Sequence, residues 1–126
     1  MKKFKSENWN SKKRKLNIII SKNNWLYPHS FWIKKTLRNY GHNVKIYTNH
    51  QKIRPSDINL ILSYNKLIPK NFLNKSKRNM VIHESDLPKG RGFSPISWDI
   101  LKGNKFLTFS LFNIVISFRF CVWNFY

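Results

Sequence analysis

Residues 81–92 read Val-Ile-His-Glu-Ser-Asp-Leu-Pro-Lys-Gly-Arg-Gly, and Phe93-Ser94-Pro95 follow them. The segment opens with apolar, partly β-branched residues, which is typical of a buried strand. It turns polar at His83, and a proline and two glycines at close spacing then make the chain fold back. Ser94 can cap a following helix, with Pro95 as its first residue. A strand that ends in a histidine, then a constrained loop and a helix, is how open α/β sheets build sites.

The segments before this loop alternate between strand and helix patterns. Short apolar, β-branched runs predict buried strands at 16–21, 44–47, 58–63 and 78–83. Helices are predicted at 28–40, where Gly41 ends the helix, and at 70–76 and 94–102. This order predicts an α/β fold, with a Rossmann-like, mostly parallel sheet and helices on both faces. No glycine follows the first strand, so a dinucleotide site of the usual kind is not expected.

The composition fits one small domain with a core. The chain has 126 residues, of which 41% are hydrophobic and 16% aromatic. Its net charge of +19 attracts polyanions, although the lysines are spread along the whole chain, as a general drift of composition would also leave them. Cys121 is the only cysteine, which excludes an internal disulfide. We expect no bound metal and a reducing, cytoplasmic location.

The two ends of the chain differ from its middle. Residues 1–15 are basic and predict a flexible tail, or a basic arm that contacts phosphates, and the apolar run behind them is too short for a signal peptide. The α/β domain is predicted at 16–113, and 114–126 form an atypical apolar segment. For 106–126 we favour one or two strands over a membrane anchor or a poorly folding end. Arg119 and other polar residues interrupt the apolar run there.

The loop motif resembles that of a known family. The matching residues are His83, Ser85, Pro88, Arg91-Gly92 and Ser94-Pro95. At this spacing they resemble the formyltransferases that use 10-formyltetrahydrofolate. The resemblance covers roughly residues 16–112 and implies the Rossmann-type N-terminal domain of that family. It implies transfer of a formyl group from 10-formyltetrahydrofolate to a small-molecule amine, such as that of a nucleotide-linked sugar, or to methionyl-tRNA.

The resemblance also implies roles for individual residues. His83 is the expected catalytic residue, although a histidine can also simply close a strand. The strand end and loop at 64–69 are expected to bind the formyl donor through Tyr64, Asn65, Leu67, Ile68 and Pro69. The expected substrate and loop residues are Ser85, Asp86, Arg91, Gly92 and Ser94. Asp86 is equally suited to capping the turn, and Arg91 to lying in solvent.

Two departures from the family pattern predict an activity that is weak at best. The family commonly has Asn two residues before the histidine, where this chain has Val81. It also has a catalytic Asp after the strand that matches 106–112, and no acid follows here, so the pattern looks cut short. Glu84 and Asp86 are the nearby carboxylates. The alternative function is a small basic nucleic-acid-binding protein that uses Lys, Arg, Trp and Tyr.

Overall fold

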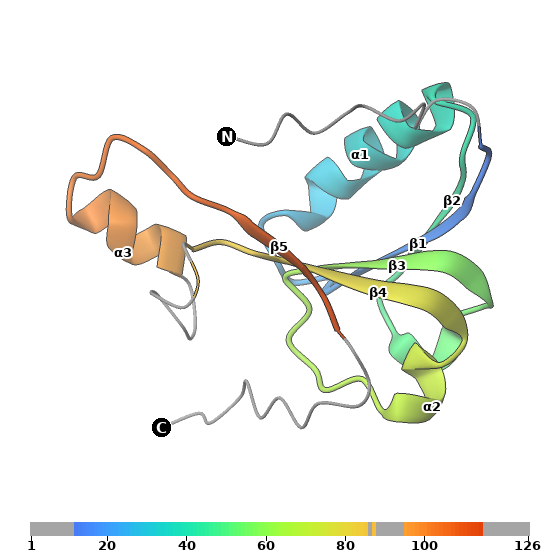
Figure 1. Ribbon diagram of the computed structural model, residues 1–126. Helices are drawn as coiled ribbons and strands as arrows, with labels where there is room; N and C mark the ends of the chain where they lie inside the picture. The colour runs from blue at the N-terminus through green and yellow to red at the C-terminus, as the bar shows by residue number, and fades with distance from the viewer. Residues whose placement is uncertain (1–11, 86, 88–94, 115–126) are drawn as a thin grey trace, which may run out of the picture.

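The chain is seen in a computed structural model, which describes residues 12–85, 87 and 95–114 (Figure 1). Its elements follow the alternating order that the sequence predicts. In chain order they are β1 (Lys15–Ile20), α1 (Tyr27–Asn39), β2 (Asn43–Tyr47), the 3-10 helix η1 (His50–Lys52), β3 (Ser56–Leu62), α2 (Lys70–Leu73), β4 (Ser76–His83), α3 (Pro95–Leu101) and β5 (Ser110–Asn113).

The strands form one five-stranded sheet in the order β2-β1-β3-β4-β5. The pairs β1–β2, β1–β3 and β3–β4 are parallel, and β5 pairs antiparallel with β4. The predicted α/β fold with a mostly parallel sheet is therefore confirmed. The connections through α1, η1 and α2 each carry the chain back to the amino end of the sheet, so the next strand runs parallel to the others.

Helices cover both faces of the sheet, as predicted. Figure 1 shows α1 on one side of the strands and α2 on the other. Ile18 and Ile20 belong to a core with residues of α1, whereas Ile19 belongs to a core on the opposite face with Leu73 of α2. All three isoleucines of β1 are fully buried. A central strand covered on both faces has no solvent side, which explains its continuous apolar run.

The helix boundaries follow local signals, with one correction. Pro28 lies in the first turn of α1, and Gly41 follows the helix with φ of 86°, which favours glycine. The helix predicted at 70–76 is shorter, because α2 ends at Leu73 and Ser76 already begins β4. Ser76 pairs in register with Ser56, and the two hydroxyls lie 2.6 Å apart. This pairing across the sheet replaces the last turn of the expected helix.

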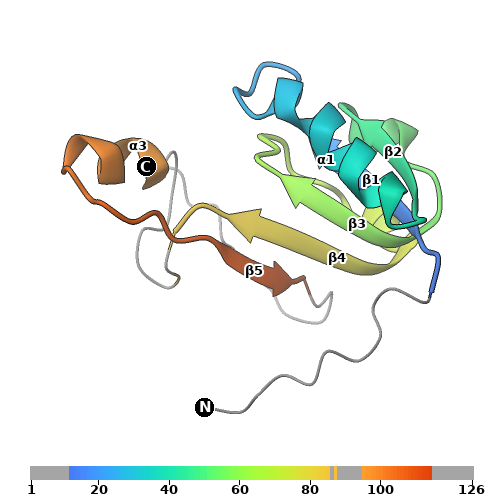
Figure 2. The same cartoon turned by 90° about the horizontal axis from the view of Figure 1, so that it is seen from above.

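The last described elements are α3 and β5. Helix α3 starts at Pro95 as predicted, and Figures 1 and 2 show it beside the end of the sheet, not over a face. Its Trp98 is 61% exposed. Strand β5 confirms a strand within 106–126. The predicted helix cap, Ser94, and the rest of the C-terminal segment, 115–126, lie outside the described residues.

Candidate functional site

Three parallel strands bring their carboxyl ends to the same edge of the sheet. Ile20 of β1 is in register with Leu62 of β3, and Leu62 with Ile82 of β4. The polar residues Ser21, Ser63 and His83 therefore leave the sheet side by side. Open α/β sheets bind ligands at this edge, beyond the carboxyl ends of the strands.

Ser21 ties the loop after β3 to the end of β1. Its hydroxyl donates to Asn65 Oδ1 at 2.7 Å and accepts the Asn65 backbone N–H at 2.9 Å. Ser21 is buried, whereas Asn65 is exposed. The polar end of β1 thus fixes the backbone at the start of the predicted donor-binding loop.

Ser63 links the ends of β3 and β4. Among the described non-glycine residues, Ser63 is the one whose backbone has a positive φ, 44°. Its hydroxyl donates to Glu84 Oε1 at 3.0 Å. A left-handed backbone at a non-glycine residue costs free energy, and such residues are enriched at functional sites. The interaction holds the Glu84 carboxylate between the two strand ends, next in the chain to His83.

Tyr64 holds the same loop from the face of the sheet that α2 covers. Its side chain is buried with Ile19 and Ile61. Its hydroxyl accepts the His50 backbone N–H at 3.1 Å and lies 2.9 Å from His50 Nδ1. The His50 ring also contacts Phe72 edge-on, with 5.1 Å between ring centroids. The structure therefore places the Tyr64 hydroxyl inside the protein, where it supports the loop.

The other predicted donor-binding residues lie further along this loop. Ile68 is half-buried and packs against the core on the α2 face, whereas Leu67 is 75% exposed. Pro69 is exposed and precedes α2. Asn65 and Leu67 thus present polar and apolar groups to solvent from a loop that is fixed at both ends.

His83 ends β4 and is half-buried, opposite Ser110 of β5. Of the predicted substrate and loop residues, Ser85 is buried, with 4% exposure. Asp86, Arg91, Gly92 and Ser94 lie outside the described residues, so the predictions made for them stay predictions. The structure thus joins the strand ends around His83, namely Ser21 with Asn65 and Ser63 with Glu84.

Sequence reasoning missed Ser63, Ser110 and His50. Ser63 gives no signal for a positive φ, because serine is not a residue that favours this conformation. Ser110 lies in a mostly apolar segment, where nothing in the sequence distinguishes its hydroxyl. The pairing of His50 with Tyr64 joins two loops, and nothing in the spacing of the two residues indicates it.

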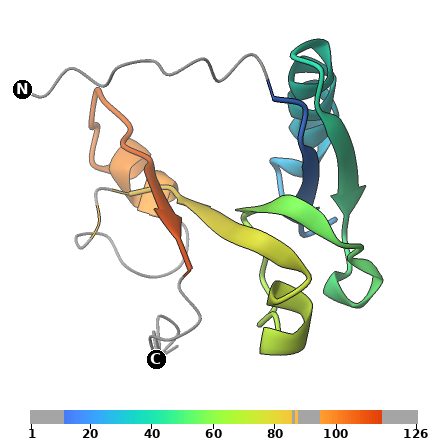
Figure 3. The ribbon, with the colours of Figure 1, turned by 45° about the vertical axis from the view of Figure 1, so that its right-hand side comes forward.

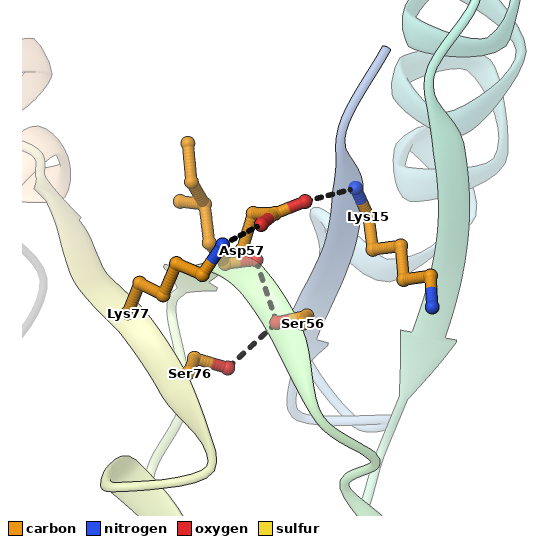
Figure 4. A network of polar contacts seen from close by, with 6 residues as sticks. Lys15, Ser56, Asp57, Ser76 and Lys77 are labelled. Carbon is orange, nitrogen blue, oxygen red and sulfur yellow. Dashed lines mark hydrogen bonds and ion pairs between the residues drawn. The ribbon is translucent and has the colours of Figure 1, made fainter.

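A second group of polar side chains lies at the amino ends of the strands, far along the strands from His83. Asp57 accepts the Lys15 backbone N–H at 2.8 Å and a bond from Lys77 Nζ at 2.9 Å, and Figure 4 shows these contacts beside the Ser56–Ser76 pair. The backbone N–H of Lys15, followed by the Lys77 ammonium, lowers the pKa of the Asp57 carboxyl below its ordinary value.

Two surface cavities are lined by residues other than those described above at the ends of β3 and β4. One, of about 390 Å³, is on α1 and is lined by Phe31, Lys34 and Arg38 among others. The other, of about 530 Å³, lies beside η1 and is lined by Lys52, Arg54 and Lys75 among others. Within the described residues no group of three or more His, Cys, Asp or Glu side chains is arranged to hold a metal. No helix of the described part is long and apolar enough to span a membrane.

The chain is similar to known formyltransferases. It is 35% identical over 75 residues to a methionyl-tRNA formyltransferase of Prochlorococcus marinus, a match that covers 50% of this chain and 23% of the relative. Over 51 residues it is 43% identical to that of Buchnera aphidicola, a match that covers 40% of this chain and 16% of the relative. The chain thus matches about a fifth of the length of these relatives. A scan of protein-family models finds no match.

The fold is also similar to that of a formyltransferase. The solved methionyl-tRNA formyltransferase of Clostridium thermocellum superposes with a TM-score of 0.60 at 26% identity, covering 80% of this chain and 46% of that one. The alternative of a small nucleic-acid-binding protein gains no support from these matches. The chain is therefore similar in sequence and in fold to formyltransferases, and its α/β fold is like that of their N-terminal domain.

Proposed function

We propose that the carboxyl edge of the sheet transfers a formyl group from 10-formyltetrahydrofolate to an amine. The observation that carries the proposal is the position of His83, at the end of β4 and beside the fixed ends of β1 and β3. Sequence and fold similarity to formyltransferases support the reaction class.

Formyl transfer requires the protein to stabilise a developing charge and to assist a proton transfer. Negative charge develops on the formyl oxygen when the amine attacks the formyl carbon. As the charge returns from this oxygen, the bond from the formyl carbon to N10 breaks, and tetrahydrofolate leaves with N10 taking up a proton in exchange for the proton that the amine loses. His83 is suited to stabilise this charge by donating a hydrogen bond from its ring to the formyl oxygen. Glu84 supplies a carboxylate at the same strand end, where its Oε1 accepts a hydrogen bond from the Ser63 hydroxyl at 3.0 Å. We assign to this carboxylate one of two roles, to accept the proton that the amine loses or to interact electrostatically with the His83 ring.

The loop at 64–69 fits the formyl donor, which supplies the one-carbon group when bound. The donor combines flat apolar rings with polar edges. The exposed Leu67 and Asn65 offer one contact of each kind, and the Ser21 and Tyr64 hydroxyls hold the backbone in place. A preformed loop lowers the entropy that binding must overcome.

For the acceptor we favour methionyl-tRNA over the amine of a nucleotide-linked sugar. The relatives with the matching sequences are methionyl-tRNA formyltransferases. The chain also has a net charge of +19, which attracts a polyanionic substrate. A cytoplasmic location follows from this acceptor.

Val81 is expected to make the activity low. The amide that the family commonly carries two residues before the histidine is replaced by an apolar side chain. Loss of one such donor typically slows catalysis by about a hundredfold. Val81→Asn is therefore expected to raise the rate, because the side chain would regain a donor on the strand that carries His83.

The test is a transfer assay with 10-formyltetrahydrofolate and either methionyl-tRNA or an amino sugar nucleotide. His83→Ala is expected to abolish transfer. His29→Ala is the matched control, because His29 is an exposed histidine of α1 and should leave the rate unchanged. Equal loss in both variants, or no transfer by the wild-type chain and by Val81→Asn, would contradict the proposal.

A further inference from the structure

The hydroxyl of Ser110 holds the chain immediately after His83. It donates to the Ser85 carbonyl oxygen at 2.6 Å and accepts the Leu87 backbone N–H at 3.2 Å. Ser110 is the first residue of β5 and lies opposite His83 in the antiparallel pair. One side chain from β5 thus binds the backbone on both sides of residue 86.

This contact is placed to control the direction of the strand end. On one side, the ladder between β4 and β5 fixes His83. On the other, Ser85 is 4% exposed and Leu87 is half-buried, so the turn starts inside the protein. Without the Ser110 hydroxyl, the Ser85 carbonyl and the Leu87 N–H would lack a hydrogen-bond partner, which would destabilise this arrangement of the backbone. The segment after His83 would then shift to recover hydrogen bonds.

We propose that Ser110 is the positioning residue of the candidate site, which holds His83 in its working orientation by binding the backbone of Ser85 and Leu87. The expected effect on catalysis rests on the proposed formyl transfer. The effect on the orientation of the His83 ring does not, because it follows from contacts within the protein.

The residue type can be tested separately from its position. A hydroxyl is needed that both donates and accepts, so Ser110→Thr should preserve both bonds, and threonine also suits a strand. Ser110→Ala removes both. Asn113→Ala is the matched control, because Asn113 ends the same strand and its side chain accepts the Asn79 backbone N–H at 3.2 Å, away from His83.

The first measurement needs no activity. Amide exchange of Leu87 and the ring proton signals of His83 are recorded by NMR for the wild-type chain and the three variants. Ser110→Ala should speed exchange at Leu87 at least tenfold and shift the His83 ring signals, while Ser110→Thr and Asn113→Ala keep both as in the wild type. Unchanged His83 signals in Ser110→Ala, or equal changes in Asn113→Ala, would overturn the proposal.

The second measurement uses the kinetic constants of formyl transfer. Ser110→Ala should lower kcat about tenfold and leave KM for the formyl donor unchanged, because a displaced general catalyst slows chemistry more than binding. Ser110→Thr should restore kcat. A fall in kcat that Ser110→Thr does not restore would overturn the positioning role. If the chain transfers no formyl group but the NMR changes occur, the proposed function fails and the positioning of His83 by Ser110 stands.

Discussion

The middle of the sheet and its carboxyl edge use polar side chains in different ways. Midway along β1, β3 and β4, Asn17, Asn59 and Asn79 occupy paired register positions and bond one another, with 3.0 Å and 2.8 Å between side-chain nitrogen and oxygen. At the carboxyl ends, serine and tyrosine hydroxyls bind loops. Figure 3 shows the strands side by side, with α2 at one end of β4 and α3 beyond the other.

The difference separates polar residues that bond one another within the sheet from those that lie at the proposed site. The asparagines are buried, and their bonds lie mostly within the sheet, so they close a network. The polar residues at the carboxyl ends include Ser63, whose backbone is left-handed, and they support the exposed loop at 64–69. Burial of a polar residue therefore does not indicate a site by itself, whereas its place at a strand end does.

The largest expected effect is on stability at the asparagine row. Asn59 Oδ1 accepts bonds from Asn17 and from Ser76, at 3.0 Å and 2.8 Å, and its nitrogen donates to Asn79. Asn59→Ala leaves these buried partners unsatisfied and should lower the free energy of unfolding by about 3 kcal/mol. The shift of the urea midpoint measures it.

Asn43→Ala is the control for this change. Asn43 is the exposed first residue of β2, and its replacement should change the free energy of unfolding by less than about 0.5 kcal/mol. Similar losses in the two variants would show that the buried row is not a closed network.

A smaller effect is expected at Ser63, where the backbone is left-handed. Ser63→Val should cost about 2 kcal/mol, because a β-branched residue is strained at this φ. Ser63→Gly relieves the strain but loses the bond to Glu84, so its net effect on unfolding should stay within about 1 kcal/mol. If valine is tolerated as well as glycine in urea unfolding, the strand end is not held as described.

Tyr64→Phe should reduce stability by about 1 kcal/mol. It removes the hydroxyl that accepts the His50 backbone N–H and leaves the packing of the ring in place. Tyr40→Phe is the control, because Tyr40 is 61% exposed and should show no change in thermal unfolding. Equal melting temperatures for the two variants would remove the anchoring role of Tyr64.

The smallest effect is on the pH dependence of stability through Asp57. Its folded pKa lies below the ordinary value of 3.8, so its contribution is fully present above that pH and is lost as the pH falls through the folded pKa. The effect is small because the Lys77 side chain is mostly exposed. Asp57→Asn should lower the urea midpoint at pH 7 and less so at pH 3. A difference that stays constant between these pH values would contradict this assignment.

The sequence predicted the sheet well because its strands are buried on both faces. Continuous runs such as 16–20 and 58–62 carry this signal directly, and Gly41 and Pro95 mark helix ends where the structure has them. The end of α2 was less predictable, since Ser76 joins β4 through a partner, Ser56, that lies twenty residues earlier.

The candidate site was predictable only in part. His83 stands in a motif that the sequence shows directly, and the structure places it at the end of β4, as expected. The partners that organise this edge come from β5, η1 and the end of β1. Contacts such as Ser110 with Leu87 or His50 with Tyr64 depend on how distant segments pack, which local patterns do not encode.

The central claim is that the carboxyl edge, and not the asparagine row, is the site of the protein. We would titrate the chain with a stable analogue of 10-formyltetrahydrofolate and follow backbone amide signals by NMR. We expect saturable shifts of the amide signals at 63–68 and 83–87, with those of Asn17, Asn59 and Asn79 unchanged. Saturable shifts centred on the asparagine row, or no shift at millimolar ligand, would contradict it.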